Sequence, residues 1–299
     1  MEKDAKTRFF WSRERDFTFK TCLRQYFFRY YAGLSPQTGG PRDKEIAILH
    51  RLNHRQDWAN EQVQRIIRAV LESGNPPPAA DILVQELLTA MRADFRDSRN
   101  GLYRQAGNAS KGLFEHEYQL KVPDHIWKEN ADRAEDAVRR FLESETLKWI
   151  LALPPEARLE SPKGVEFILD GLPVRVRPGF AFRRDDRIEL VHWRMESPLQ
   201  LDDIESAGRV LYAASKWNVS LEKIQLVDVE LSTGEEHRHA VDEDALNFAK
   251  EYIHDSADEM QFPLDDPETN TAAEDNFDTT EDDAPCRRCP YLKVCPKWT

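Results

Sequence analysis

The sequence has no apolar run close to the roughly 20 residues that a membrane-spanning helix needs, and its mean hydropathy is −0.68. It also lacks a GxxxxGK[ST] phosphate loop, a glycine-rich dinucleotide turn, a GxSxG nucleophile motif and an HExxH zinc motif. We therefore expect neither a membrane protein nor a nucleotide-driven motor. Any helicase that works with this protein would be a separate chain.

Cysteine is scarce, with four residues in 299. Cys286, Cys289 and Cys295 stand in CRRCPYLKVC, and Cys22 lies near the start in FKTCLRQYFFRYY. Structural zinc usually takes two Cys-x2-Cys pairs, whereas a larger 4Fe–4S cluster accepts a three-plus-one arrangement. The spacing favours an iron–sulfur cluster on these four residues that ties the two ends of the chain together. A zinc site and unliganded cysteines are the alternatives.

The first residues, MEKDAKTRFFW, are charged and have no apolar core of the kind that a secretory signal needs. This predicts a cytoplasmic protein. A reducing cytoplasm keeps thiols free for metal binding and disfavours disulfides.

The net charge of −12 is unevenly distributed. Residues 251–283 contain 13 acidic side chains and no Lys or Arg, so the remainder is close to neutral, with 42 basic and 41 acidic residues. An acidic total does not exclude nucleic-acid binding, because local patches decide it. Residues 261–285 are acidic and poor in apolar side chains, which predicts a linker that cannot order itself. A mimic of nucleic acid is the alternative interpretation.

Hydrophobic periodicity predicts an α/β protein with a helical region, about residues 34–155, inserted before a sheet-containing core, about residues 160–260. We expect helices over about 44–73, 82–98, 123–151, 202–217 and 243–260, and strands in VEFILD, PVRVRPGFAFR, RIELVHWRM, KIQLVDVEL and EEHRHAV. The basic and aromatic residues 1–31 could stack bases. Burial of their aromatic side chains beside the cysteines is the favoured interpretation.

Several landmarks together resemble one family. These are the aromatic and basic stretch after Cys22, Ser98–Tyr103, Leu113–Tyr118 and the closing Cys-x2-Cys-x5-Cys. The chain is similar to the iron–sulfur branch of the PD-(D/E)XK nuclease superfamily, which includes RecB-like nucleases, AddB-type subunits and CRISPR-associated iron–sulfur exonucleases. The resemblance implies a restriction-endonuclease-like core within residues 1–260, a linker over 261–285, and a cysteine motif in 286–299 that completes the cluster with Cys22.

The resemblance also implies a catalytic hairpin, but its diagnostic residues differ here. Active members present Pro-Asp and then (Asp/Glu)-x-Lys, whose carboxylates hold Mg²⁺ or Mn²⁺. The corresponding family positions are occupied by Gln64, Gly179, His192, Arg194 and Gly208, with Tyr212 retained. Glycine supplies no ligand, and arginine effectively cannot lose a proton to act as a base.

Three functions follow from this pattern. The first is a catalytically degenerate nuclease that binds DNA through Arg175, Arg177 and Arg194, as an accessory factor to a helicase or nuclease subunit in repair, recombination or defence. The second is an active Mg²⁺- or Mn²⁺-dependent nuclease whose carboxylates have moved, with Glu115, Glu117 and Glu166 as candidates. The third is an interaction or redox-sensing adaptor with no nucleic-acid role.

Overall fold

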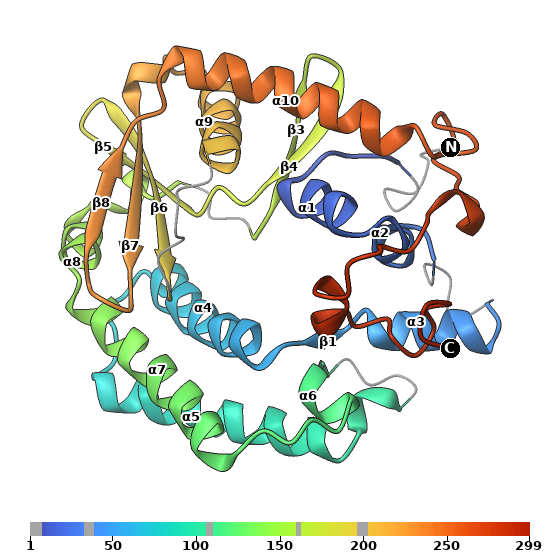
Figure 1. Ribbon diagram of the computed structural model, residues 1–299. Helices are drawn as coiled ribbons and strands as arrows, with labels where there is room; N and C mark the ends of the chain where they lie inside the picture. The colour runs from blue at the N-terminus through green and yellow to red at the C-terminus, as the bar shows by residue number, and fades with distance from the viewer. Residues whose placement is uncertain (1–7, 33–38, 106–109, 160–162, 196–202) are drawn as a thin grey trace. The chain divides into compact units, whose positions relative to one another are not determined.

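The computed structural model describes residues 8–32, 39–105, 110–159, 163–195 and 203–299, which form a mixed α/β protein (Figure 1). The chain divides into two compact units. The first contains Met1–Leu52, Glu166–Val176 and Asp244–Thr299, and the second contains Asn53–Val165 and Arg177–Glu243. This division cuts across the predicted segments, because the helical region and the main sheet share the second unit. No described helix has the length and apolar character needed to cross a membrane.

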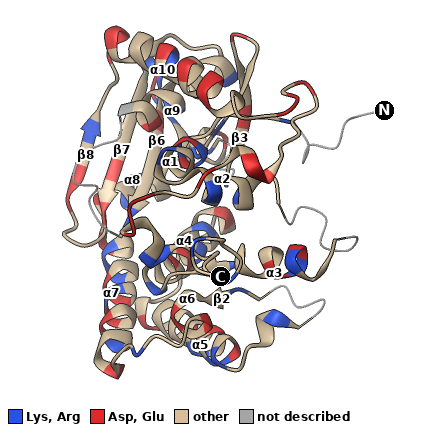
Figure 2. Cartoon of the chain, turned by 45° about the vertical axis from the view of Figure 1, so that its right-hand side comes forward, with Lys and Arg blue, Asp and Glu red and all other residues tan. Residues whose placement is uncertain are grey.

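The second unit begins with a group of amphipathic helices. They are α4 (Arg55–Ser73), α5 (Ala80–Arg99), α6 (Phe114–Glu117), α7 (Asp124–Glu143) and α8 (Glu145–Ala152), with short elements η1 (Leu102–Arg104), β2 (Gly112–Leu113) and η2 (Pro155–Ala157). In α7, apolar residues face the core while charges of both signs line its surface (Figure 2). Charged side chains on one face and apolar ones on the other are what a surface helix needs.

Two predicted helices are each divided in the structure. The helix expected over 123–151 is interrupted at Ser144, whose backbone is extended and whose Oγ accepts a hydrogen bond from Leu147 N at 3.2 Å. A serine at this position caps the next helix by satisfying one of its free N–H groups. The helix expected over 44–73 is likewise divided. It corresponds to α3 (Pro41–Leu49) and α4, which are separated by β1 (Leu52–Asn53) at the boundary of the units.

A four-stranded sheet completes the second unit. Its order is β5 (Phe180–Arg184), β6 (Arg187–Arg194), β7 (Ile224–Glu230) and β8 (Glu236–His239). β5 and β6 form an antiparallel hairpin with its turn at Asp185–Asp186, and β8 is antiparallel to β7. β6 and β7 are parallel, and the chain passes between them through α9 (Asp203–Trp217) and η3 (Leu221–Lys223). α9 packs on β7.

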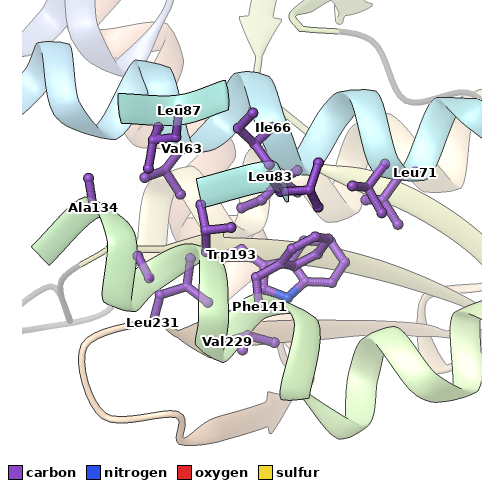
Figure 3. Close-up of a cluster of buried hydrophobic side chains, with 14 of the residues drawn as sticks. Val63, Ile66, Leu71, Leu83, Leu87, Ala134, Phe141, Trp193, Val229 and Leu231 are labelled. Carbon is purple, nitrogen blue, oxygen red and sulfur yellow. The ribbon is translucent and has the colours of Figure 1, made fainter. Parts of the chain in front are cut away.

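The two faces of β6 have different surroundings because side chains alternate across a strand. Trp193 and Val191 face a hydrophobic core built from α4, α5, α7 and the sheet, shown in Figure 3. Trp193 meets Phe141 edge to face at 5.3 Å and Phe180 at 5.7 Å between ring centroids. His192 and Arg194 point to the opposite face, where Arg209 of α9 contacts His192. The packing of one face thereby fixes where the other face presents its polar side chains.

The first unit combines segments that are distant in sequence. They are α1 (Arg13–Thr21), α2 (Leu23–Tyr30), α3, the hairpin of β3 (Val165–Leu169) and β4 (Leu172–Val176), α10 (Glu243–Gln261), η4 (Glu274–Asn276) and η5 (Pro285–Arg288). Trp11, which lies just before α1, joins two of them, β4 and α10. Its N–H donates to Pro173 O, its carbonyl accepts from Arg175 N, both at 2.8 Å, and its indole donates to Ser256 Oγ at 3.2 Å.

The acidic segment packs against this unit instead of forming the unstructured linker expected from its composition. Phe277 is 0% exposed, and its ring lies 5.4 Å from that of Phe27 and 6.1 Å from that of Tyr26. Arg24 donates to Phe277 O at 2.7 Å and, through its backbone N–H, to Asp278 O at 3.0 Å. One aromatic side chain and partners from outside the segment order it, although the segment itself has few apolar residues.

Candidate functional site

The four cysteines line one cavity of the first unit. Cys22 lies in extended backbone between α1 and α2, while Cys286 and Cys289 lie in and just after η5, and Cys295 follows six residues later. The cavity encloses about 350 Å³ of empty space, part of it open to solvent. The structure thus brings together the four residues that the sequence proposed as ligands. The rest of the lining is half apolar or aromatic and half polar or charged: Phe28, Pro285, Tyr291, Leu292 and Trp298, with Arg24, Gln25, Thr279, Thr280 and Lys297.

Burial disfavours ionisation of two of the thiols in this cavity, Cys289 and Cys295. Burial raises the pKa of Cys289 to about 12, and the neighbouring Cys22, Cys295 and Cys286 add to the rise. The pKa of Cys295 is also raised, chiefly by burial. Grouped, desolvated thiols ionise readily only when a cation binds them, because thiolates are the metal-binding form. This donor set therefore fits a thiolate-bound metal centre.

The sulfur atoms are too widely spaced for one tetrahedral ion. In the described part of the chain, three His, Cys, Asp or Glu ligand atoms come within 4.8 Å of one another only at Glu230, Glu235 and His237, an exposed group near the β7–β8 turn. Since all four cysteines belong to that part, no three of their sulfurs are so close. Zinc–sulfur bonds of about 2.3 Å would put sulfurs roughly 3.8 Å apart around one zinc ion.

The acidic segment forms part of the cavity wall and is held at both ends. Glu274 pairs with Arg24 of α2, and Arg42 of α3 binds both of its carboxylate oxygens at 2.6 and 2.7 Å. Arg42 also donates to Val294 O at 3.2 Å, next to Cys295. At the other end, Lys297 donates to Thr280 O at 2.7 Å and pairs with Asp283 at 2.6 Å. In Figure 1 the C-terminal segment accordingly runs beside α2 and α3.

The second candidate site is the hairpin of the second unit, where Gly179 stands at the position for which the resemblance implies an aspartate. Its φ is +81°, a left-handed conformation that side chains rarely adopt. A Cβ at this position would lie 2.4 Å from the backbone oxygen of Val191. The backbone is therefore built around glycine, and an aspartate could not simply replace it.

The polar residues of this hairpin gather around one buried carboxylate. Asp228 of β7 lies directly beside His192 of β6 in the parallel register. Its Oδ1 accepts from Arg194 Nε at 3.0 Å and lies 3.7 Å from Arg209 Nη1. Arg209, which is 1% exposed, also pairs with Glu205 at 2.8 Å and donates to His192 Nδ1 at 3.2 Å.

The electrostatics of this cluster favour an anion over a cation. Burial, together with Arg209, Arg194 and Arg177, holds the pKa of His192 well below its ordinary value. Asp228 Oδ2 and Arg209 Nε are buried and have no hydrogen-bond partner within the described residues. A divalent cation here would meet one carboxylate that already neutralises two arginines, which is a poor site for Mg²⁺.

The other positions that the resemblance singled out contribute to the packing of the fold. The side-chain amide of Gln64 donates to Trp193 O at 2.7 Å, so it ties α4 to β6. Tyr212 is buried and meets Trp217 edge to face at 5.8 Å between ring centroids. Gly208 lies within α9. None of these contacts involves Asp228.

Each of the three candidate relocated carboxylates pairs with arginine. Glu115 accepts from Arg55 at 3.2 Å, and Glu117 accepts from Arg104 at 2.9 Å. Glu166, in the first unit, pairs with Arg8 and with Arg175 at 3.0 Å. Arg175, one of the predicted DNA-binding residues, thus belongs to the first unit, whereas Arg177 and Arg194 belong to the second.

Sequence reasoning missed Asp228, Arg209 and Glu205 as members of the hairpin site. Asp228 had a detectable signal, because it is an acid in the middle of the apolar strand KIQLVDVEL. A charge at such a position is almost never buried without a partner. Arg209 and Glu205 are separated by four residues on α9, a spacing that also occurs on solvated helix faces. Nothing in the sequence distinguished them.

Comparison of the sequence with protein-family models, and with curated proteins, gave no match.

Proposed function

We propose that this chain is a nuclease-like protein of the PD-(D/E)XK type that carries a 4Fe–4S cluster and binds DNA without cutting it. The strand order supports the nuclease-like core. An antiparallel hairpin, a crossover helix and a parallel strand follow one another in β5, β6, α9 and β7. The hairpin carries the residues at the family's catalytic positions.

The cluster would be held by Cys22, Cys286, Cys289 and Cys295. The observation that carries this part is that the four thiols line one cavity although Cys22 is more than 250 residues from the others in the sequence. A bound cluster would supply a cross-link between the ends of the chain. The spread of the sulfurs and the single Cys-x2-Cys pair favour iron–sulfur over zinc.

The hairpin site supports binding without hydrolysis. Metal-assisted phosphodiester hydrolysis needs carboxylates that hold a divalent cation and a group that activates water. Gly179 leaves no room for the first carboxylate, and Asp228 is engaged by Arg194 and Arg209. Arginine retains its proton and binds phosphate well through its planar fork.

On this proposal the chain works in the cytoplasm as an accessory factor to a helicase or nuclease subunit. Such a subunit would supply the motor or the cutting activity that this chain lacks. The active-nuclease alternative gains no support from Glu115, Glu117 and Glu166, since each is paired with arginine.

The test is a pair of assays on the anaerobically purified full-length chain. We expect salt-dependent binding of a labelled DNA, and no cleavage with Mg²⁺ or Mn²⁺. Metal-dependent cleavage would establish the active-nuclease alternative. Absence of binding to both single- and double-stranded DNA would favour the adaptor alternative.

A further inference from the structure

His192 and Arg194 lie next to each other on the face of β6 that is turned toward α9, and both side chains can donate hydrogen bonds. Arg194 is held by a single hydrogen bond, from Nε to Asp228, and its side chain is 20% exposed. Among the residues that the structure describes, none accepts a hydrogen bond from its Nη1 or Nη2. His192, two residues earlier on the same face, has a side chain that is 25% exposed. Side chains two apart on a strand are neighbours about 7 Å apart, the scale of a phosphate group and its contacts.

The contact with Arg209 determines which nitrogen of His192 carries the proton. A guanidinium has donors only, so at 3.2 Å from Arg209 Nη2 the Nδ1 of His192 must accept. A neutral imidazole with an accepting Nδ1 carries its proton on Nε2. His192 is therefore a neutral donor through Nε2, and protonation of Nδ1 would break its bond to Arg209.

The charged groups around His192 keep it in that state. Its charged neighbour on β6 is Arg194, and its neighbour on β7 is Asp228. The helix α9 contributes Arg209 and Glu205. Arg177 adds to the positive potential at the ring. His239 of β8 lies behind Asp228, with Nε2 3.8 Å from Oδ2.

These charges leave an excess of positive charge at the exposed donors. The site has three arginines, Arg177, Arg194 and Arg209, but only two carboxylates. Asp228 is buried, and Glu205 pairs with Arg209. The side chains of Arg194 and His192 are partly exposed, and the nitrogens not engaged by Asp228 or Arg209 are donors, a set that suits an oxyanion.

We propose that Arg194 and His192 form a metal-independent subsite for one phosphate group of a nucleic-acid backbone, with Arg209 and Asp228 as positioning residues. This inference rests on the proposed function and deepens it. The fork of Arg194 takes two phosphate oxygens, while Nε2–H of His192 donates to the phosphate without changing its protonation. Binding is therefore insensitive to chelator and nearly constant over neutral pH.

The first experiment measures the DNA affinity of the full-length chain by fluorescence anisotropy with a labelled oligonucleotide in EDTA. We expect Arg194→Ala to weaken binding about 10-fold and to lower the salt slope by about one. Arg194→Lys keeps the charge and a donor for Asp228 but loses the fork, so we expect a loss of about 3-fold in a folded protein. Arg187→Ala is the matched control, because Arg187 is exposed at the other end of β6. It should change affinity less than about 2-fold.

Two results would overturn the subsite while leaving the proposed function intact. One is wild-type binding that Arg194→Ala and Arg194→Lys reduce no more than Arg187→Ala does. The other is binding that requires Mg²⁺, or that strengthens more than about 3-fold between pH 8 and pH 6.5, which would require a titrating histidine. A wild-type chain that binds no DNA overturns the proposed function itself.

A second measurement tests the subsite without DNA. Long-range ¹H–¹⁵N spectra of the histidine rings should show His192 neutral with its proton on Nε2 at pH 7. Addition of inorganic phosphate should shift the Nε2–H resonance in wild-type protein but not in Arg194→Ala. A proton on Nδ1, or an equal shift in both proteins, contradicts the inference.

Discussion

Replacing Glu274 by glutamine tests whether the acidic segment is a structural part of the thiol cavity. The carboxylate accepts hydrogen bonds from Arg24 and from both terminal nitrogens of Arg42. A glutamine at this position would keep the size of the side chain but lose its charge and one acceptor oxygen. Glu274→Gln should therefore loosen the wall between Cys22 and Cys295.

The expected loss is modest because the pairs are partly exposed, with 25% of the Glu274 side chain and 50% of the Arg42 side chain accessible. A charge-assisted hydrogen bond is worth about 1.5–3 kcal/mol when shielded, and partial exposure reduces this considerably. We expect about 1–2 kcal/mol of unfolding free energy for the whole group.

The pH dependence of this effect has a defined sign. Hydrogen bonds from Arg42 lower the pKa of Glu274 more than burial raises it. A lowered pKa means that the carboxylate stabilises the fold fully above its unfolded pKa of about 4.3 and loses this effect as the pH falls through the folded pKa. The difference between wild type and Glu274→Gln should be constant from about pH 6 to pH 8 and shrink below about pH 4.

The assay follows unfolding by urea and, in parallel, the rate at which a thiol reagent modifies the cysteines of the metal-free protein. Asp275→Asn is the matched control, because Asp275 is adjacent in the sequence and is not one of the partners of Arg24 or Arg42. We expect faster labelling and lower stability only in Glu274→Gln. Equal behaviour of the two variants would mean that the Glu274 contacts do not hold the segment against the cavity.

Three further predictions concern other parts of the molecule. Gly179→Asp should not restore cleavage and should cost about 2–4 kcal/mol of stability, because of its positive φ and the contact with Val191 O; a stable variant with metal-dependent cleavage would refute this. Cys289→Ser should lose its brown colour and aggregate, because a cross-link closing so long a loop is worth roughly 5 kcal/mol; a well-folded colourless variant would contradict the structural role of the cluster. Ser144→Ala should cost about 1 kcal/mol through loss of the bond to Leu147 N, measured by urea unfolding, and no loss would mean that the cap contributes nothing.

Local sequence patterns predicted much of the element order. The strands of the β5–β6 hairpin, the helix before β7 and the last helix all lie close to where periodicity placed them. Errors fell at helix boundaries and in one strand: the segment PVRVRPGFAFR, expected as a single strand, is divided into β4 and β5, which belong to different sheets. Ser144 ends one amphipathic pattern and caps the next without a proline or glycine to mark the break.

The acidic segment was misjudged because its order comes from distant residues. Its composition is that of a chain too polar to fold alone. Arg24 and Arg42, more than 200 residues earlier, neutralise Glu274, and Phe277 enters an aromatic group on α2. No local pattern could have indicated these partners.

The candidate sites were predictable to different degrees. The cysteine pattern alone pointed to a common site, and the four residues do line one cavity. For the hairpin, the sequence identified His192 and Arg194 but not the carboxylate that positions them. Asp228 becomes their neighbour only through the parallel pairing of β6 and β7. A pairing between strands some 30 residues apart cannot be read from the spacing of residues within either strand.

The most direct test of the central claim is the metal content and absorption spectrum of the wild-type chain purified without oxygen. We expect a brown protein with about four iron atoms and four sulfides per chain, lost when any one of the four cysteines is replaced by serine. A colourless, folded protein that contains one zinc ion, or no metal, would contradict it.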